Sequence, residues 1–176
     1  MLKQASAALI LVLIVSIYGA SIDFQIYNVS KFMDTTFPVW TYNTTDSQLF
    51  YKCKVDKVES LTKTYVYFNR SYQYISRTEV TTESLEGTFV MGNESVMDIG
   101  ERGLLKEFAE ILEFASDDYL CGVFLVRYYS GKTQWYDLRF KNENGTGKPD
   151  QACVKYFEGR KMPGHLIYGP ECKTSR

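Results

Sequence analysis

Few side chains in this 176-residue sequence have the types and spacings that catalysis or metal binding requires. His165 is the only histidine, and no second histidine or cysteine lies near it in the sequence, as a zinc site would need. Asp117 and Asp118 are paired carboxylates, but adjacent residues of a loop usually face solvent. The H-E-x-x-H, G-x-S-x-G, EF-hand and glycine-rich phosphate-binding motifs are all missing. We therefore predict no catalytic residue, no metal and no cofactor, and we expect a binding protein.

The N-terminus has the pattern of a secretory signal peptide. A positive charge at Lys3 precedes an uncharged, largely apolar run over residues 5–18, and small residues follow at positions 19–21. A membrane-spanning helix needs about 20 apolar residues, which is more than this run supplies. We therefore predict that residues 1–20 are removed, with cleavage one residue earlier or later as the alternatives. Residues 21–176 are then one secreted domain without a membrane span.

Secretion gives a meaning to the cysteines and to the glycosylation triplets. In an oxidising compartment an even number of cysteines predicts disulfide bonds, and four cysteines allow three pairings. The cysteines are Cys53, Cys121, Cys153 and Cys172. Five N-x-S/T triplets predict a heavily glycosylated surface. The predicted glycosylation sites are Asn28, Asn43, Asn69, Asn93 and Asn144.

The composition restricts the partners of the protein. The chain has 20 Lys and Arg residues against 21 Asp and Glu residues, and its formal net charge is −1. Nucleic-acid binders need a basic face to neutralise phosphates, so we predict no nucleic-acid partner. With 45% hydrophobic and 15% aromatic residues, the chain can build the core of one domain.

Most of the chain after residue 48 has the pattern of strands, with alternating aromatic, Thr and Val residues. The predicted strands cover residues 49–58, 62–69, 72–80, 88–91, 120–129 and 133–140. Arg70-Ser71 and Ser130-Gly131-Lys132 are the predicted hairpin turns. A short helix is expected within residues 22–33, and Asp150 can cap a second short helix near the C-terminus.

The segment from Leu104 to Ala115 has two interpretations. Its apolar residues recur at the spacing of an amphipathic helix, which the local pattern favours. The alternative is a strand that packs on both faces. With the extended aromatic segment Phe37–Tyr42, about seven other strands are predicted, and an antiparallel sheet of that size needs closure to remove its edges. A closed barrel of about eight strands can hold one small ligand inside.

Several segments carry a resemblance to a known family. They are Tyr51-Lys-Cys53-Lys-Val, Ala115-Ser-Asp-Asp-Tyr-Leu-Cys121-Gly-Val-Phe-Leu-Val-Arg-Tyr, Trp135-Tyr-Asp-Leu-Arg, Cys153-Val-Lys-Tyr-Phe and Tyr168-Gly-Pro-Glu-Cys172. These segments, and above all the cysteine spacing, resemble the tick salivary lipocalins, the group that includes the histamine-binding proteins. The G-x-W signature of ordinary lipocalins is absent.

The resemblance implies an all-β fold. This is an eight-stranded antiparallel up-and-down β-barrel with a short N-terminal helix and a C-terminal helix packed outside the barrel. It also implies the disulfides Cys53–Cys172 and Cys121–Cys153. Because residues 107–115 match a barrel strand of the family, we predict a strand there, against the local helical spacing.

The resemblance also implies a ligand inside the barrel. Amine-binding members hold a cationic ligand with carboxylates at positions that correspond here to Gly122 and Asp137. One of the two charges is therefore missing, and Arg139 adds a positive charge nearby, which argues against histamine or serotonin. The predicted lining of the barrel is instead apolar and aromatic. It consists of Val66, Phe68, Tyr74, Gly122, Phe124, Val126, Tyr128, Trp135 and Asp137.

We therefore predict a monomeric protein secreted in saliva that binds a sterol, fatty acid or eicosanoid and modulates host immune or inflammatory responses. The size, the triplets and the uncharged wall are compatible with the japanin-like branch of tick lipocalins, which holds cholesterol. Two alternatives remain open. One is a scavenger of biogenic amines, and the other is an immunomodulator that binds a host immune-cell receptor or a complement component through its outer surface.

Overall fold

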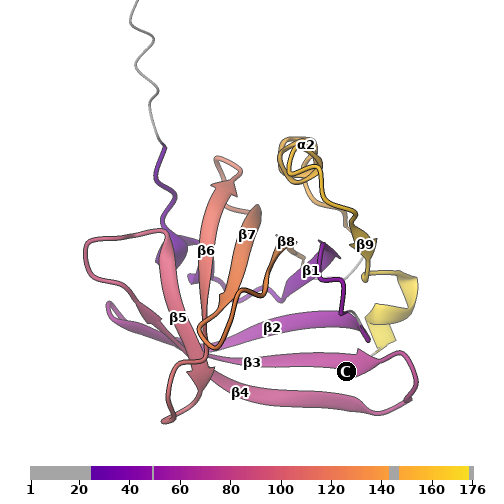
Figure 1. The fold of residues 1–176 in the computed structure, drawn as a ribbon, viewed down its shortest axis with the longest axis horizontal. Helices are drawn as coiled ribbons and strands as arrows, with labels where there is room; N and C mark the ends of the chain where they lie inside the picture. The colour runs from indigo at the N-terminus through magenta and orange to yellow at the C-terminus, as the bar shows by residue number, and fades with distance from the viewer. Residues whose placement is uncertain (1–24, 49, 143–146, 175–176) are drawn as a thin grey trace, which may run out of the picture.

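The computed structural model describes residues 25–48, 50–142 and 147–174, and the predicted signal peptide (residues 1–20) lies outside them. Eight antiparallel strands of this part of the chain form a closed barrel (Figure 1). Each of them pairs with the next along the chain, and β1 pairs with both β8 and β2. They are β1 (Val39–Thr44), β2 (Tyr51–Leu61), β3 (Tyr65–Tyr74), β4 (Val80–Phe89), β5 (Val96–Glu101), β6 (Phe108–Ala115), β7 (Cys121–Tyr128) and β8 (Gln134–Lys141). The predicted up-and-down barrel is confirmed.

In the segment with two interpretations, the strand β6 covers Phe108–Ala115, which confirms the strand predicted over residues 107–115, while residues 104–107 precede it without regular structure. β6 is hydrogen-bonded to β5 on one side and to β7 on the other. The helical spacing is misleading because both faces of β6 are covered. On the outside, Phe114 stacks on Tyr156 at a distance of 4.7 Å between the ring centroids. On the inside, Phe108 and Leu112 are buried in the barrel.

The prediction of a hairpin turn at Arg70-Ser71 is wrong. Both residues lie within β3, which continues to Tyr74, and the chain turns at residues 75–79. In the sequence, the charged Arg70 suggests a turn because the residue that neutralises its charge cannot be identified there. Here Arg70 is buried, and it forms an ion pair with Asp56 of the neighbouring strand β2. The short strand β5 has no counterpart among the predicted strands.

Two helices flank the barrel. Helix α1 (Val29–Met33) follows its N-cap Asn28, and its residues Phe32 and Met33 are completely buried. The Phe32 ring contacts Phe124 of β7, with 5.0 Å between the ring centroids, so α1 closes one end of the barrel. Helix α2 (Gln151–Glu158) begins after the N-cap Asp150 and packs against β6, β7 and β8. Within the described residues, no helix has the length and apolar character needed to cross a membrane.

The C-terminal segment is attached to the outside of the barrel by both disulfides. Cys121–Cys153 joins the start of β7 to α2, and Cys53–Cys172 joins β2 to the short 3-10 helix η1 (Pro170–Thr174). This is the pairing that the resemblance implies. Between them, β9 (His165–Leu166) adds to β1. A second apolar cluster surrounds the disulfides, separate from the core inside the barrel.

Candidate ligand-binding cavity

A cavity of about 310 Å³ lies inside the barrel at the end opposite α1. Small-molecule sites span about 300–1,000 Å³, so this cavity is among the small ones. It is placed where β3 and β7 end and where β2, β4, β6 and β8 begin. Its lining combines aromatic rings with charged groups. The lining residues are Asp46, Gln48, Tyr51, Lys54, Arg70, Tyr72, Tyr74, Glu83, Phe108, Tyr128, Thr133 and Trp135.

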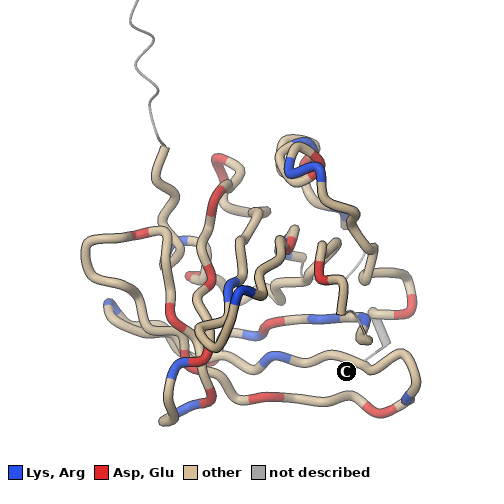
Figure 2. Tube along the Cα trace, in the orientation of Figure 1, with Lys and Arg blue, Asp and Glu red and all other residues tan. Residues whose placement is uncertain are grey.

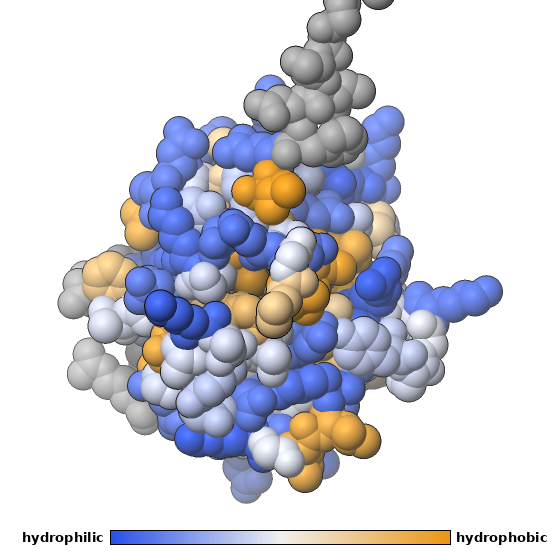
Figure 3. Space-filling model, turned by 90° about the vertical axis from the view of Figure 1, so that its left-hand side faces the viewer, coloured by the Kyte–Doolittle hydropathy of each residue, from blue (hydrophilic) through white to orange (hydrophobic). Residues whose placement is uncertain are grey.

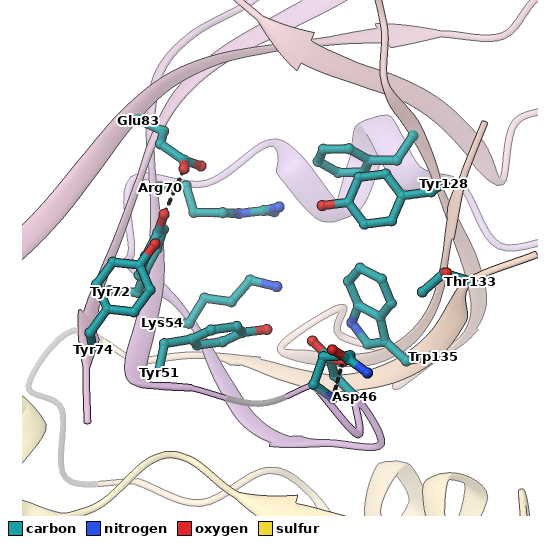
Figure 4. A pocket seen from close by; sticks show the side chains of 12 residues that line it. Asp46, Tyr51, Lys54, Arg70, Tyr72, Tyr74, Glu83, Tyr128, Thr133 and Trp135 are labelled. Atoms are coloured by element: carbon teal, nitrogen blue, oxygen red, sulfur yellow. Dashed lines mark hydrogen bonds between the residues drawn. The ribbon is translucent and has the colours of Figure 1, made fainter. Parts of the chain in front are cut away.

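Aromatic rings form two facing walls of the cavity (Figure 4). Tyr51 and Tyr72 contact each other on the side of β2 and β3, with their ring centroids 5.5 Å apart. On the side of β6, β7 and β8, Tyr128 contacts Phe108 at 5.4 Å and Trp135 at 5.6 Å. Facing rings of this kind suit a flat or apolar ligand.

The side chains of Lys54 and Arg70 project between these walls (Figure 4). Lys54 Nζ lies 2.8 Å from Oδ2 of Asp137. Arg70 donates two hydrogen bonds of 2.7 Å to Asp56 and one of 2.9 Å to Glu110. The floor of the cavity is therefore charged, although the sequence predicts an apolar wall.

Arg139 completes a buried network of three cations and three carboxylates. It forms ion pairs with both oxygens of Glu110 and, at 3.0 Å, with Asp137. Its Nη1 also lies 3.7 Å from Asp56. The Arg139 guanidinium lies 4.5 Å from the centre of the Phe124 ring, so the network meets the apolar core there. The formal charges of the six groups sum to zero, which is what allows them to be buried.

The network keeps its carboxylates ionised. Burial favours the neutral acid, but Arg139 and Arg70 outweigh it and lower the pKa of the Glu110 carboxyl to about 2. In the same way, Lys54 and Arg139 lower the pKa of Asp137 against the effect of burial. Burial lowers the pKa of the Lys54 ammonium, and the charge of Asp137 opposes that effect. At neutral pH both carboxylates are therefore negatively charged acceptors.

The structure divides the nine predicted lining residues into two groups. Tyr74, Tyr128 and Trp135 line the cavity. The others do not line it. Asp137 belongs to the ion-pair network, and Gly122 lies beside α1, where an added Cβ would be 3.0 Å from the Phe32 ring. The remaining four are packed in the core between the cavity and α1. They are Val66, Phe68, Phe124 and Val126.

The charged residues Lys54, Asp56, Arg70 and Glu110 are missing from the sequence-based prediction. One signal points to Arg70, because the alternation of inward residues Val66 and Phe68 continues directly to it in β3. The predicted turn at this position hides that signal. Glu110 is a single charge between Ala109 and Ile111, and the sequence does not show its partner. Lys54 and Asp56 lie among other charged residues of the same segment, so the sequence does not single them out.

The predicted glycosylation sites differ in their surroundings. Asn93 is exposed in the turn between β4 and β5. Asn28 and Asn69 are half-buried, and each side chain donates a hydrogen bond to a nearby glutamate. Asn43 is also half-buried, and its Oδ1 is enclosed without a hydrogen-bond partner among the described residues. Asn144 lies outside the described residues.

Positive and negative residues are interspersed along the chain (Figure 2). On the face shown in Figure 3, hydrophilic residues surround several separate apolar patches. The exposed apolar residues come from several separate loops and strands, for example Met91 and Leu105. The cavity is thus the feature with the most specific arrangement of groups.

Comparison with known proteins identifies the fold. No protein-family model matches the chain, and no curated protein matches it. Among solved structures, it is similar to AM182, solved in complex with serotonin, with a TM-score of 0.60 and 15% identity over 87% of this chain and 97% of that one. It is also similar to japanin from Rhipicephalus appendiculatus bound to cholesterol, with a TM-score of 0.57 and 8% identity over 78% and 96% of the two chains. A third similar structure is apocrustacyanin C2, with a TM-score of 0.56 and 12% identity over 82% and 81%. The chain therefore has the lipocalin fold.

Proposed function

We propose that this chain, which has the lipocalin fold, is a secreted salivary protein that sequesters a small hydrophobic ligand. The observation that carries the proposal is the cavity of about 310 Å³ between two aromatic walls. The rest of the barrel interior is filled, because α1 inserts Phe32 and Met33 into its other end. A ligand therefore occupies only the half of the barrel that faces away from α1.

The biological setting of the proposal rests on the sequence. The signal-peptide pattern, the glycosylation triplets and the cysteine spacing support secretion in the manner of the tick salivary lipocalins. A secreted protein that removes a lipid mediator would dampen host immune or inflammatory responses. We propose that the protein acts as a monomer through its ligand, and that it has no enzymatic activity. A host receptor bound at the outer surface is the alternative partner.

A biogenic amine is the second candidate ligand. Two carboxylates of the cavity favour it, because Asp46 and Glu83 lie at the wall rather than within the buried network. Glu83 accepts a hydrogen bond of 2.6 Å from the Tyr72 hydroxyl, and Asp46 accepts one from the Gln48 backbone. Lys54 and Arg70 project into the same space, and their positive charges would repel a cationic ligand.

The proposal is tested by native mass spectrometry of the secreted, deglycosylated protein, followed by extraction into organic solvent. We expect a co-purified hydrophobic molecule at one per chain. Titration calorimetry with histamine and serotonin tests the second candidate. An empty barrel that binds an amine tightly would replace the first function by the second. An empty barrel that binds neither amines nor lipids would contradict both.

A further inference from the structure

Hydrogen-bonding capacity is used unequally at the floor of the cavity. Asp137 accepts four hydrogen bonds, which is close to the full capacity of a carboxylate. Its Oδ1 accepts from the Thr44 hydroxyl and the Trp135 indole, and its Oδ2 accepts from Lys54 and Arg139. It has little capacity left for a ligand.

The other two carboxylates of the network are also engaged. Glu110 accepts from Arg70 and Arg139 at Oε1 and again from Arg139 at Oε2. Asp56 accepts from Nε and Nη2 of Arg70. Neither carboxylate is part of the cavity lining. The buried negative charges therefore face the cations of the protein rather than a ligand.

The cations Lys54 and Arg70, in contrast, have donors to spare. An ammonium has three donors, and among the described residues Lys54 uses one of them, toward Asp137. Arg70 uses Nε and Nη2, while Nη1 makes no hydrogen bond with any described residue. Both head groups point into the space between the aromatic walls (Figure 4). The floor thus offers donors, and no free buried acceptor, to whatever enters the cavity.

We infer that the ligand is an amphipathic acid whose carboxylate binds Lys54 Nζ and Arg70 Nη1. This inference rests on the proposed function and names its ligand class. The apolar or aromatic body of the acid lies between the Tyr51–Tyr72 wall and the Phe108–Tyr128–Trp135 wall. Hydrogen bonds between a carboxylate and these cations are charge-assisted and stronger than neutral ones. The hydroxyl of a sterol could accept only a weaker hydrogen bond between a cation and a neutral group, and a protonated amine has no acceptor for these donors.

Matched ligand pairs test the inference by titration calorimetry. The first pair, decanoate and decan-1-ol, differs in its head group, and the second pair, indole-3-acetate and tryptamine, carries opposite charges on the same ring. A hydrogen bond to a charged group contributes about 1.5–3 kcal/mol, which corresponds to roughly 10- to 100-fold in affinity. We expect the acid of each pair to bind at least about tenfold more tightly than its partner.

A substitution locates the binding of the head group. Lys54→Met removes one donor of the floor, while Asp137 keeps its hydrogen bonds from Thr44, Trp135 and Arg139. It should weaken decanoate binding by roughly 10- to 100-fold and weaken decan-1-ol binding much less, because the hydroxyl carries no charge. Lys57→Met is the matched control, since Lys57 is exposed on the same strand. Thermal unfolding checks that both variants are folded.

The outcomes separate the inference from the proposed function. If decan-1-ol or tryptamine binds as tightly as its acid partner, the inference is overturned and the proposed function stands. The same holds if folded Lys54→Met binds decanoate like the wild type. If none of the four compounds binds, the inference is overturned, and the mass spectrometry of co-purified molecules decides the proposed function separately. The comparison of the pairs needs only the wild-type protein, so it decides even if Lys54→Met does not fold.

Discussion

Replacing Glu110 by Gln is the most direct perturbation of the buried network. Glu110 is completely buried and faces Arg70 and Arg139, and the amide removes the negative charge while keeping the size of the side chain. Two buried guanidinium groups then share the remaining carboxylates. Breaking a buried ion pair from one side typically costs 3–5 kcal/mol. We expect Glu110→Gln to be strongly destabilising at neutral pH.

The pKa of Glu110 gives a second measure of the same effect. Its carboxyl titrates at about 2 in the folded protein instead of at the ordinary value of 4.5. The difference of about 2.5 pH units corresponds to roughly 3 kcal/mol of stability. Because the folded-state pKa is the lower one, this stability is fully present above pH 4.5. It is lost progressively as the pH falls toward 2.

Urea unfolding monitored by tryptophan fluorescence measures both effects. At pH 7 the free energy of unfolding of Glu110→Gln should be about 3 kcal/mol below that of the wild type. The difference should shrink as the pH falls from 4.5 toward 2, because the wild-type carboxyl becomes neutral as well. Glu113→Gln is the matched control on the same strand. It breaks a partly exposed ion pair with Arg160, which should contribute less than about 1 kcal/mol.

Equal losses in Glu110→Gln and Glu113→Gln at pH 7 would refute this reasoning. So would a difference between Glu110→Gln and the wild type that stays constant from pH 7 to pH 3. The first result would mean that the network contributes no more than a surface ion pair. The second would mean that the pKa of Glu110 is the same in the folded and the unfolded protein, so that the network does not hold its carboxyl in the ionised form.

Three further predictions concern the buried core, one disulfide bond and the glycosylation sites. Phe32→Ala should lower the free energy of unfolding by about 3–5 kcal/mol, because it empties a fully buried ring site, and urea unfolding measures this loss. Replacing both Cys53 and Cys172 by Ser opens a loop of 119 residues and should cost close to 5 kcal/mol in the same assay. In protein secreted from eukaryotic cells, Asn93→Gln should remove a glycan and increase gel mobility, whereas Asn43→Gln should leave the mobility unchanged because the Oδ1 of the half-buried Asn43 is enclosed by the fold.

Much of the fold could be predicted from the sequence. The turn residues Ser130-Gly131-Lys132 between two strand-like segments indicate the hairpin of β7 and β8. The strand β6 could not be derived from its own pattern, since Leu104 to Ala115 has helical spacing. The local pattern fails because β6 is covered from both sides by parts of the chain that are distant in sequence. The family resemblance leads to the correct interpretation.

The site was predicted less completely than the fold. Aromatic lining residues such as Tyr128 and Trp135 follow from the alternation within a strand, which is a local property. Phe124 obeys the same alternation, yet it lies in the packed core, because α1 fills that half of the barrel with Phe32. How deep a cavity extends depends on what closes the barrel, and no strand pattern contains that information.

By itself, the sequence determined the strand-rich character of the chain after residue 48, the hairpin of β7 and β8, the cysteines available for disulfides and the aromatic character of the cavity walls. These properties depend on residue type and on spacing within one segment. Only the tertiary structure decided that the floor of the cavity is charged. Arg70 and Glu110 are 40 positions apart, and a buried charge is stable only beside a partner of opposite sign. Closure of the barrel brings those partners together, and it thereby turns an apparently apolar wall into one that offers hydrogen-bond donors.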